Sequence, residues 1–215
     1  MAIRPVFEVA LNKNLYVKRD IEFQWYSGFA LSQKRKCIQS LHQNYLDRYK
    51  DKNVLEISSK SENKLGVQLS AFNLMMNFGG KTFSVETAYQ GGKIFEHGGP
   101  FTDLLDKPSI AAKKDLRLKN NGKVLGFSFF EEKFPCSPTT YFYNWLYINA
   151  LAQNEDLREE IMKYDAFTNI VFNPQKSLNC QAIAAAIYVS LRQQSLLKDA
   201  LENSENFLSI VYPKL

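Results

Sequence analysis

The order of hydrophobic and polar residues predicts a chain of short strands and longer helices. Alternating apolar positions and β-branched or aromatic content predict strands at residues 5–10, 20–26, 54–58 and 167–172. Residues 65–76 alternate poorly, but their composition predicts a further strand or extended segment that ends at Asn77 and the Gly79–Gly80 turn. Apolar residues at helical spacing predict helices over residues 32–45, 84–95, 109–122, 138–152, 155–163 and 177–193.

The ends of these helices carry start and stop signals. Three serines are predicted to stand at helix N-termini: Ser32, Ser84 and Ser109. The run GGP at residues 98–100 is predicted to close the helix after Ser84, and Pro138 stands where a first-turn proline would. In the last helix a single apolar stripe is formed by Cys180, Ala184, Ile187 and Leu191. The 215 residues contain no repeat, low-complexity tract or linker, which indicates one α+β domain with more helix than strand.

Composition and charge narrow the class of protein. The net charge of +5 favours an anionic partner, although basic stretches such as residues 34–36 and 113–119 are more typical of solvated helix faces. The three widely spaced cysteines form neither a disulfide framework nor a zinc pattern. The N-terminus lacks the apolar core of a signal peptide, and the longest apolar stretch, residues 182–189, is too short to span a membrane. We therefore expect a cytoplasmic protein without membrane contact.

Several common enzyme classes lack their motifs in this chain. The two histidines, His42 and His97, do not lie at ligand spacing from a cysteine, so we expect no metal and no cofactor. The sequence GKT at residues 80–82 imitates the end of a phosphate-binding loop, but Met75 stands where the first glycine is required. Neither G-x-G-x-x-G nor G-x-S-x-G occurs, which disfavours nicotinamide dehydrogenases and common serine hydrolases.

The candidate chemistry lies in the helix predicted to follow Ser84. At about 100° per residue, one face of this helix carries Glu86, Tyr89, Gln90 and Lys93. From spacing alone, such a carboxylate and amine are more typical of a solvated surface pair. The two adjacent glycines after Gln90 cost roughly 1 kcal/mol each relative to alanine, which favours a site that a ligand or another backbone approaches closely.

The stretch around this helix resembles the NADAR family. The family pattern has an F-S-N-F-like strand, a glycine turn and a helix reading (S/V)-E-x-x-(Y/F)-Q-x-x-K; here residues 69–73 read LSAFN and residues 85–93 read VETAYQGGK. The pieces EISSKS, GGPFTDLL, FYNWLYINAL and NPQKSLNCQA resemble one branch, the NADAR antitoxins paired with DarT-type DNA ADP-ribosyltransferase toxins. The resemblance covers nearly the whole chain.

The resemblance implies both a fold and an activity. The implied fold is α+β: a single compact NADAR/YbiA-like domain, mainly helical around a small sheet. Residues 54–215 would form its core, and residues 1–53 would add branch-specific strands and a helix packed on it. The implied activity is that of an ADP-ribosyl-guanine N-glycosidase, which removes ADP-ribose from guanine bases of DNA or RNA and acts as antitoxin to a DarT-type toxin. Direct binding to that toxin is left open.

The resemblance also suggests roles for individual residues. Glu86 is the expected acid–base or charge-stabilising group. Lys93 is the expected nucleophile, forming a Schiff base with the ring-opened sugar, and its alternative role is to hold a phosphate. The expected ligand-binding residues are Lys60, Ser70, Phe72, Asn73, Tyr89, Gln90 and Asn179.

Two departures from the family pattern bear on the choice of substrate. Many NADAR proteins carry histidine after the glutamate, where this chain has Thr87, and many end with Asp-x-x-Trp-Gly, where residues 173–180 read NPQKSLNC. These departures weaken any transfer of substrate choice from members linked to phosphoribosyl intermediates. Two alternatives stay open: an N-glycosidase of a small ribosyl phosphate, and a non-catalytic protein that binds ADP-ribose or a toxin.

Overall fold

The computed structural model describes residues 1–173 and 179–213 and confirms the α+β class. The chain groups into two compact units: unit 1 comprises residues 1–70 and 156–215, and unit 2 comprises residues 71–155. The organisation as one domain with a branch-specific part up to residue 53 stays a prediction. Among the described residues, the helices are too short or too polar to cross a bilayer.

A mixed four-stranded sheet forms the centre of unit 1, in the order β2-β1-β9-β3. Strands β1 (Ala2–Val9) and β2 (Tyr16–Phe23) form an antiparallel hairpin, and β9 (Ala166–Thr168) pairs antiparallel with β1 and parallel with β3 (Val54–Glu56). All four strands are therefore confirmed, with the hairpin starting about three or four residues earlier than predicted and β9 ending earlier.

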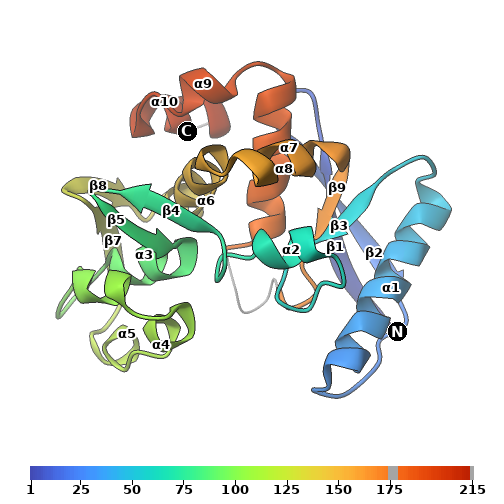
Figure 1. Cartoon of the computed structure of the whole chain (residues 1–215), viewed down its shortest axis with the longest axis horizontal. Coiled ribbons are helices and arrows are strands. Elements are labelled where there is room, and N and C mark those ends of the chain that lie inside the picture. Colours follow the sequence, from blue (N-terminus) through green and yellow to red (C-terminus); the bar gives the residue numbers. More distant parts are fainter. Residues whose placement is uncertain (174–178, 214–215) are drawn as a thin grey trace. The chain divides into compact units, whose positions relative to one another are not determined.

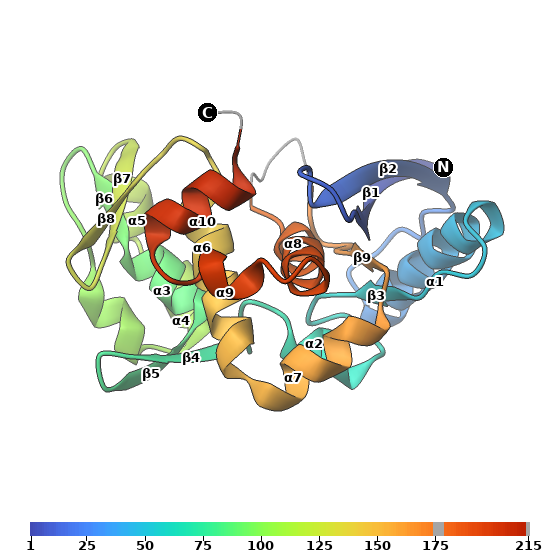
Figure 2. The same cartoon turned by 90° about the horizontal axis from the view of Figure 1, so that it is seen from above.

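One helix covers each face of this sheet: α1 (Leu31–Arg48) lies on one side and α8 (Gln181–Gln193) on the other (Figures 1 and 2). The buried face of α1 packs against apolar side chains of β1 and β2. Ser32 does not cap α1 as predicted, because the helix begins after Ala30 without a side-chain cap. The predicted start of α8 at Ser177 lies outside the described residues, and nearly every side chain of α8 is buried instead of a single stripe.

The remaining elements of unit 1 are short. Residues 65–76 are not one extended segment: α2 (Lys64–Gln68) begins after Asn63, whose side chain accepts a hydrogen bond from the backbone N–H of Leu65 (2.9 Å). The charged helix predicted up to Lys163 is confirmed as α7 (Glu155–Glu160), which starts at the boundary between the units, followed by the 3₁₀-helix η2 (Ile161–Lys163). Two C-terminal helices were not predicted, α9 (Leu197–Ala200) and α10 (Ser204–Val211).

Unit 2 contains a two-stranded and a three-stranded sheet. The first is the hairpin of β4 (Met75–Phe78) and β5 (Lys81–Ser84), and the second has the order β6 (Lys93–Phe95), β7 (Val124–Phe129) and β8 (Glu132–Pro135). In the β7–β8 turn Phe130 and Glu131 have positive φ angles of 45° and 73°, which bulky residues rarely adopt. The ring of Phe130 packs closely on the β4–β5 turn. A Cβ on Gly79 would lie only 2.3 Å from its Cε1, so the packing requires glycine there.

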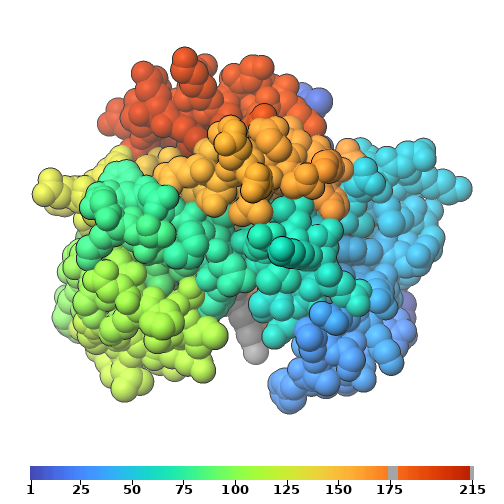
Figure 3. Space-filling view, viewed as in Figure 1, coloured from blue at the N-terminus to red at the C-terminus, as the bar shows by residue number. Residues whose placement is uncertain are grey.

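The helices of unit 2 are α3 (Val85–Gly91), the 3₁₀-helix η1 (Thr102–Asp106), α4 (Ser109–Lys113), α5 (Arg117–Asn120) and α6 (Tyr141–Gln153). The helix predicted from Ser109 to Gly122 is split, because the Asp115 carboxylate accepts from the backbone N–H of Arg117 (3.0 Å) and starts a new turn. The aromatic helix α6 is confirmed, although Pro138 precedes its first turn. Helices α4 and α5 (yellow-green) lie at the surface of unit 2 (Figure 3).

Candidate functional site

Helix α3 is short because both of its ends are fixed. Ser84 caps it as predicted, accepting a hydrogen bond from the backbone N–H of Thr87 (3.1 Å). At the other end, a Cβ on Gly92 would lie 2.9 Å from the carbonyl oxygen of Ser128 and 3.0 Å from the ring of Phe142. The close approach inferred from the glycines is therefore that of another backbone. The prediction of helix through Phe95 is wrong, because the chain turns into β6 and Lys93 stands on a strand.

A continuous hydrogen-bonded chain nevertheless joins the two expected catalytic residues. The Gln90 side-chain amide donates to Glu86 Oε1 (2.9 Å), and Lys93 Nζ donates to Gln90 Oε1 (2.7 Å). Glu86 is only 5% exposed and Gln90 6%. Because Gln90 donates at one end and accepts at the other, it fixes a carboxylate and an amine at a set separation within a largely dry environment.

The environment of Lys93 lowers the pKa of its amine. Its ammonium lies 4.8 Å from the centroid of the Tyr89 ring. Burial lowers the pKa of Lys93 to about 8; the Glu86 carboxylate partly offsets this effect, and the positive charge of Lys113 adds to it. A lysine with this pKa has an appreciable neutral fraction at physiological pH, and only the neutral amine can attack an electrophilic carbon.

Lys113 is a member of this cluster that sequence reasoning assigned to a solvated helix face. It extends from α4, and its ammonium lies 3.4 Å from Glu86 Oε1 and 4.7 Å from the centroid of the Phe72 ring. Nothing in the spacing of the sequence links Lys113 to Glu86, because the two residues meet only through the packing of α4 on α3. Glu86 is thus bounded by an amide and an ammonium.

The other predicted ligand residues of unit 2 differ in their surroundings. Tyr89 packs against the rings of Phe127 and Tyr143, with centroids 5.5 and 5.4 Å away, so it is part of the aromatic core as well as the partner of Lys93. Phe72 is half-buried beneath Lys113, whereas Asn73 is exposed. The LSAFN motif that contains Phe72 and Asn73 is a turn and not the predicted strand.

Three of the predicted ligand residues belong to unit 1. Lys60 is half-buried in the turn after β3, where its backbone N–H donates to Ser58 Oγ (3.1 Å). Ser70 is 1% exposed at the end of the first segment of unit 1, and Asn179 is half-buried just before α8. The role of these three residues in one site with Glu86 stays a prediction.

Thr87 has a structural role at the position where many NADAR proteins carry histidine. It is buried, and its hydroxyl donates to the carbonyl oxygen of Ser84 (2.9 Å) while its backbone N–H donates to the Ser84 side chain. The departure therefore reinforces the helix cap and leaves Glu86, its neighbour, in place.

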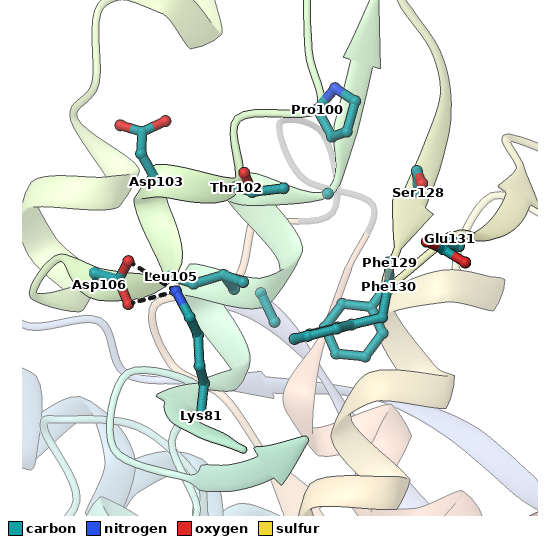
Figure 4. A pocket seen from close by; sticks show the side chains of 13 residues that line it. Lys81, Pro100, Thr102, Asp103, Leu105, Asp106, Ser128, Phe129, Phe130 and Glu131 are labelled. Carbon is teal, nitrogen blue, oxygen red and sulfur yellow. Dashed lines mark hydrogen bonds and ion pairs between the residues drawn. The ribbon is translucent and has the colours of Figure 1, made fainter. Parts of the chain in front are cut away.

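A cavity of about 530 Å³ lies in the same unit and is lined in part by Ala88 and Gly91, which helix geometry places on the face of α3 away from Glu86. Phe129 and Phe130 form one wall, and the ion pair of Lys81 with Asp106 (3.0 Å) stands at another (Figure 4). No predicted site residue is among the described residues that line it. The cavity is thus distinct from the Glu86–Lys93 cluster.

Nothing in the described part of the chain forms a metal-binding group: no three His, Cys, Asp or Glu side chains gather closely enough to hold an ion. In comparisons with known proteins, a family model described as "DarT1-associated NADAR antitoxin" matches residues 2–214. No curated protein matches the chain.

Proposed function

Because the chain belongs to the family of DarT1-associated NADAR antitoxins, we propose that it is an N-glycosidase that removes ADP-ribose from guanine bases of DNA or RNA. The observation that carries the proposal is the chain Glu86–Gln90–Lys93, in which a buried carboxylate and a lysine of lowered pKa are held apart by one amide. A lysine of lowered pKa beside a buried charged group is typical of catalytic sites. The family match supports the antitoxin role, and the site supports the reaction.

Glu86 stabilises the charge that develops when the glycosidic bond breaks. As the bond from the ribose C1′ to the guanine nitrogen cleaves, its electron pair leaves with the base, and positive charge builds on C1′ and the ring oxygen. A carboxylate that is almost fully buried interacts strongly with such a charge, because little water screens it. Gln90 and Lys113 both contact Oε1 of Glu86 and thereby orient the carboxylate.

Lys93 acts as the nucleophile in the same proposal. Its neutral amine forms a bond to C1′ as the bond to guanine breaks, and the departing base takes up a proton. The sugar ring then opens to a protonated imine, and water hydrolyses this imine to release ADP-ribose and the free amine. The alternative role of Lys93, holding a phosphate, requires the charged ammonium instead.

The first test is release of ADP-ribose from guanine-ADP-ribosylated DNA by the purified protein, with Glu86→Gln as the matched control. Gln conserves the shape of Glu86 and its contact with Gln90 but removes the negative charge. We expect release by the wild-type protein and almost none by the variant. Equal release by both proteins would remove Glu86 from the mechanism.

The same assay separates the two alternatives. An N-glycosidase of small ribosyl phosphates would release ribose phosphate from such a compound and leave modified DNA intact. A non-catalytic binder would retain ADP-ribosylated DNA without turnover, and its protection against a toxin would persist in the Glu86→Gln variant. The non-catalytic alternative does not explain why a lysine of lowered pKa lies close to a buried carboxylate.

A further inference from the structure

We propose that Lys113 is a positioning residue of this site: its ammonium holds the Glu86 carboxylate in its reactive orientation and sets the charge balance around Lys93. This inference rests on the proposed function. It adds to the site a residue that lies outside the NADAR motif quoted above and that the sequence pattern assigned to a solvated surface.

The position of Lys113 is determined by a hydrogen-bond cluster at the start of its helix. Ser109 Oγ donates to the carbonyl oxygen of Phe72 (2.8 Å) and lies 2.8 Å from Ser84 Oγ. Ser84 is also the cap of α3. Since Ser109 begins α4 and Ser84 caps α3, a shift of α4 along α3 would break the hydrogen bond between their two hydroxyls.

One turn after Ser109, the side chain of Lys113 crosses the Phe72 ring and ends at Glu86. The ammonium lies 4.7 Å from the ring centroid and 3.4 Å from Oε1. The ring is a favourable surface for a cation and limits the directions that the long side chain can take. The side chain of Lys113 is 53% exposed, so its ion pair with Glu86 contributes little to the stability of the fold. Its main effect is on the orientation of the Glu86 carboxylate.

The charges that face Lys93 come from the helices on which this arrangement rests. Glu86 from α3 favours the protonated amine, Lys113 from α4 disfavours it, and the Tyr89 ring and the Gln90 carbonyl contact the ammonium directly. Lys113 therefore has two effects that support the reaction. Its ammonium forms an ion pair with Glu86. The same positive charge disfavours protonation of the Lys93 amine, which has to be neutral to attack.

The experiment compares Lys113→Met with Lys114→Met. Methionine retains the apolar stem over Phe72 but removes the charge, and Lys114 is the next residue, also exposed, and carries the same charge. We expect Lys113→Met to lower kcat about tenfold, a part of the ~10²–10⁴ that acid–base catalysis contributes. It should also move the limb of the pH–rate profile that reports Lys93 to higher pH. Lys114→Met should change neither, and Lys113→Arg should restore most of kcat.

A second readout is independent of turnover. After reductive ¹³C-methylation of the lysines, the NMR titration of Lys93 is followed in both variants, with its signal assigned from a Lys93→Arg variant. The pKa of Lys93 should rise in Lys113→Met and stay unchanged in Lys114→Met. If the wild-type protein releases no ADP-ribose but the Lys93 titration still moves, the proposed reaction fails and the electrostatic coupling stands.

Two results would overturn the inference. One is a higher KM for modified DNA with kcat and the Lys93 titration unchanged, which would make Lys113 a phosphate contact only. The other is an equal effect of Lys113→Met and Lys114→Met on every readout, which would mean that both lysines act only through their non-specific positive charge. Ser109→Ala gives a further check, because losing the anchor while keeping the ammonium should lower kcat in the same direction.

Discussion

Two glutamates of this chain are almost equally buried, yet their surroundings differ in kind. Glu56 at the end of β3 is 2% exposed, and Glu86 in α3 is 5% exposed. The Glu56 carboxylate accepts hydrogen bonds from the hydroxyls of Ser58 and Thr168 (both 2.7 Å) and from the backbone N–H of Ile170. Glu86 instead meets one amide and one ammonium, next to a second lysine.

The comparison teaches that burial alone does not identify a catalytic carboxylate. The donors around Glu56 are all neutral and tie β3 to the end of β9, which is a structural arrangement. Burial raises the pKa of Glu56, and its hydrogen bonds only partly offset that effect. At Glu86 the neighbouring charges belong to long side chains that can respond to a substrate. We therefore expect the first glutamate to determine stability and the second to determine the rate.

The largest expected effect is on turnover. Glu86→Gln should reduce the rate of ADP-ribose release by about 10²–10⁴, the usual contribution of acid–base or charge-stabilising catalysis. Glu56→Gln should retain the activity of whatever fraction stays folded. Active-site titration or circular dichroism provides the folded fraction. A Glu56→Gln variant that folds but does not turn over would erase the distinction between the two glutamates.

The pH dependence of the rate distinguishes the two possible roles of Lys93. Because the pKa of Lys93 is lowered to about 8, a nucleophilic amine predicts a rate that rises as pH increases through 8 and the amine loses its proton. A phosphate-holding ammonium predicts the reverse, a rate that falls over that range. Lys93→Met should cost about 10²-fold or more in kcat, since it removes the nucleophile. Borohydride should trap a covalent adduct on wild-type protein and none on Lys93→Met.

For Glu56 the expected effect is on the free energy of unfolding. Glu56→Gln replaces one accepting oxygen with a donating NH₂ group, which then faces a hydroxyl or the Ile170 N–H, at a cost of about 1–3 kcal/mol. Urea denaturation measures this cost, with Glu86→Gln as the comparison variant. Because the folded-state pKa of Glu56 is raised, its contribution to stability is lost as pH rises through that pKa. The variant should lack this part of the pH dependence.

The smallest effect concerns His42, which lies 2.8 Å from the Thr168 hydroxyl that also contacts Glu56. Burial lowers the pKa of His42 to about 4. Stability linked to this residue is therefore complete above its unfolded pKa and is lost as pH falls towards 4. Between pH 7 and 5 the loss should reach at most about 2 kcal/mol, less in proportion to the remaining exposure of the ring. In the His42→Gln variant the urea midpoint should change less between pH 7 and 5 than in the wild-type protein. An equal change in both proteins would contradict the assignment.

The sequence predicted the local parts of the site and missed the long-range ones. The Ser84 cap and the spacing of Glu86 and Gln90 are properties of one helix, and both are confirmed. The bend that places Lys93 on a strand depends on the Ser128 carbonyl and the Phe142 ring, which local periodicity cannot reveal. Lys113 reaches Glu86 only through the packing of two helices.

The same reasoning explains the errors in the fold. Helix α2 has a readable start signal in Asn63, but the five residues that follow are too few to establish a helical period. The hairpin of β7 and β8 was not predicted because its turn residues are Phe130 and Glu131, whereas such two-residue turns usually carry Asn-Gly. Strained turns of this kind are visible only once the pairing of the strands is known.

The close contact between the Phe130 ring and Gly79 limits how these two positions can vary in evolution. A side chain at residue 79 would collide with the Phe130 ring and would also have to adopt a φ of +56°, which asparagine tolerates better than other residues with a side chain. Homologous chains should therefore replace this glycine, most often by asparagine, only where position 130 carries a small residue. The two hairpin tips are expected to co-vary as a pair, although many residues separate them along the chain.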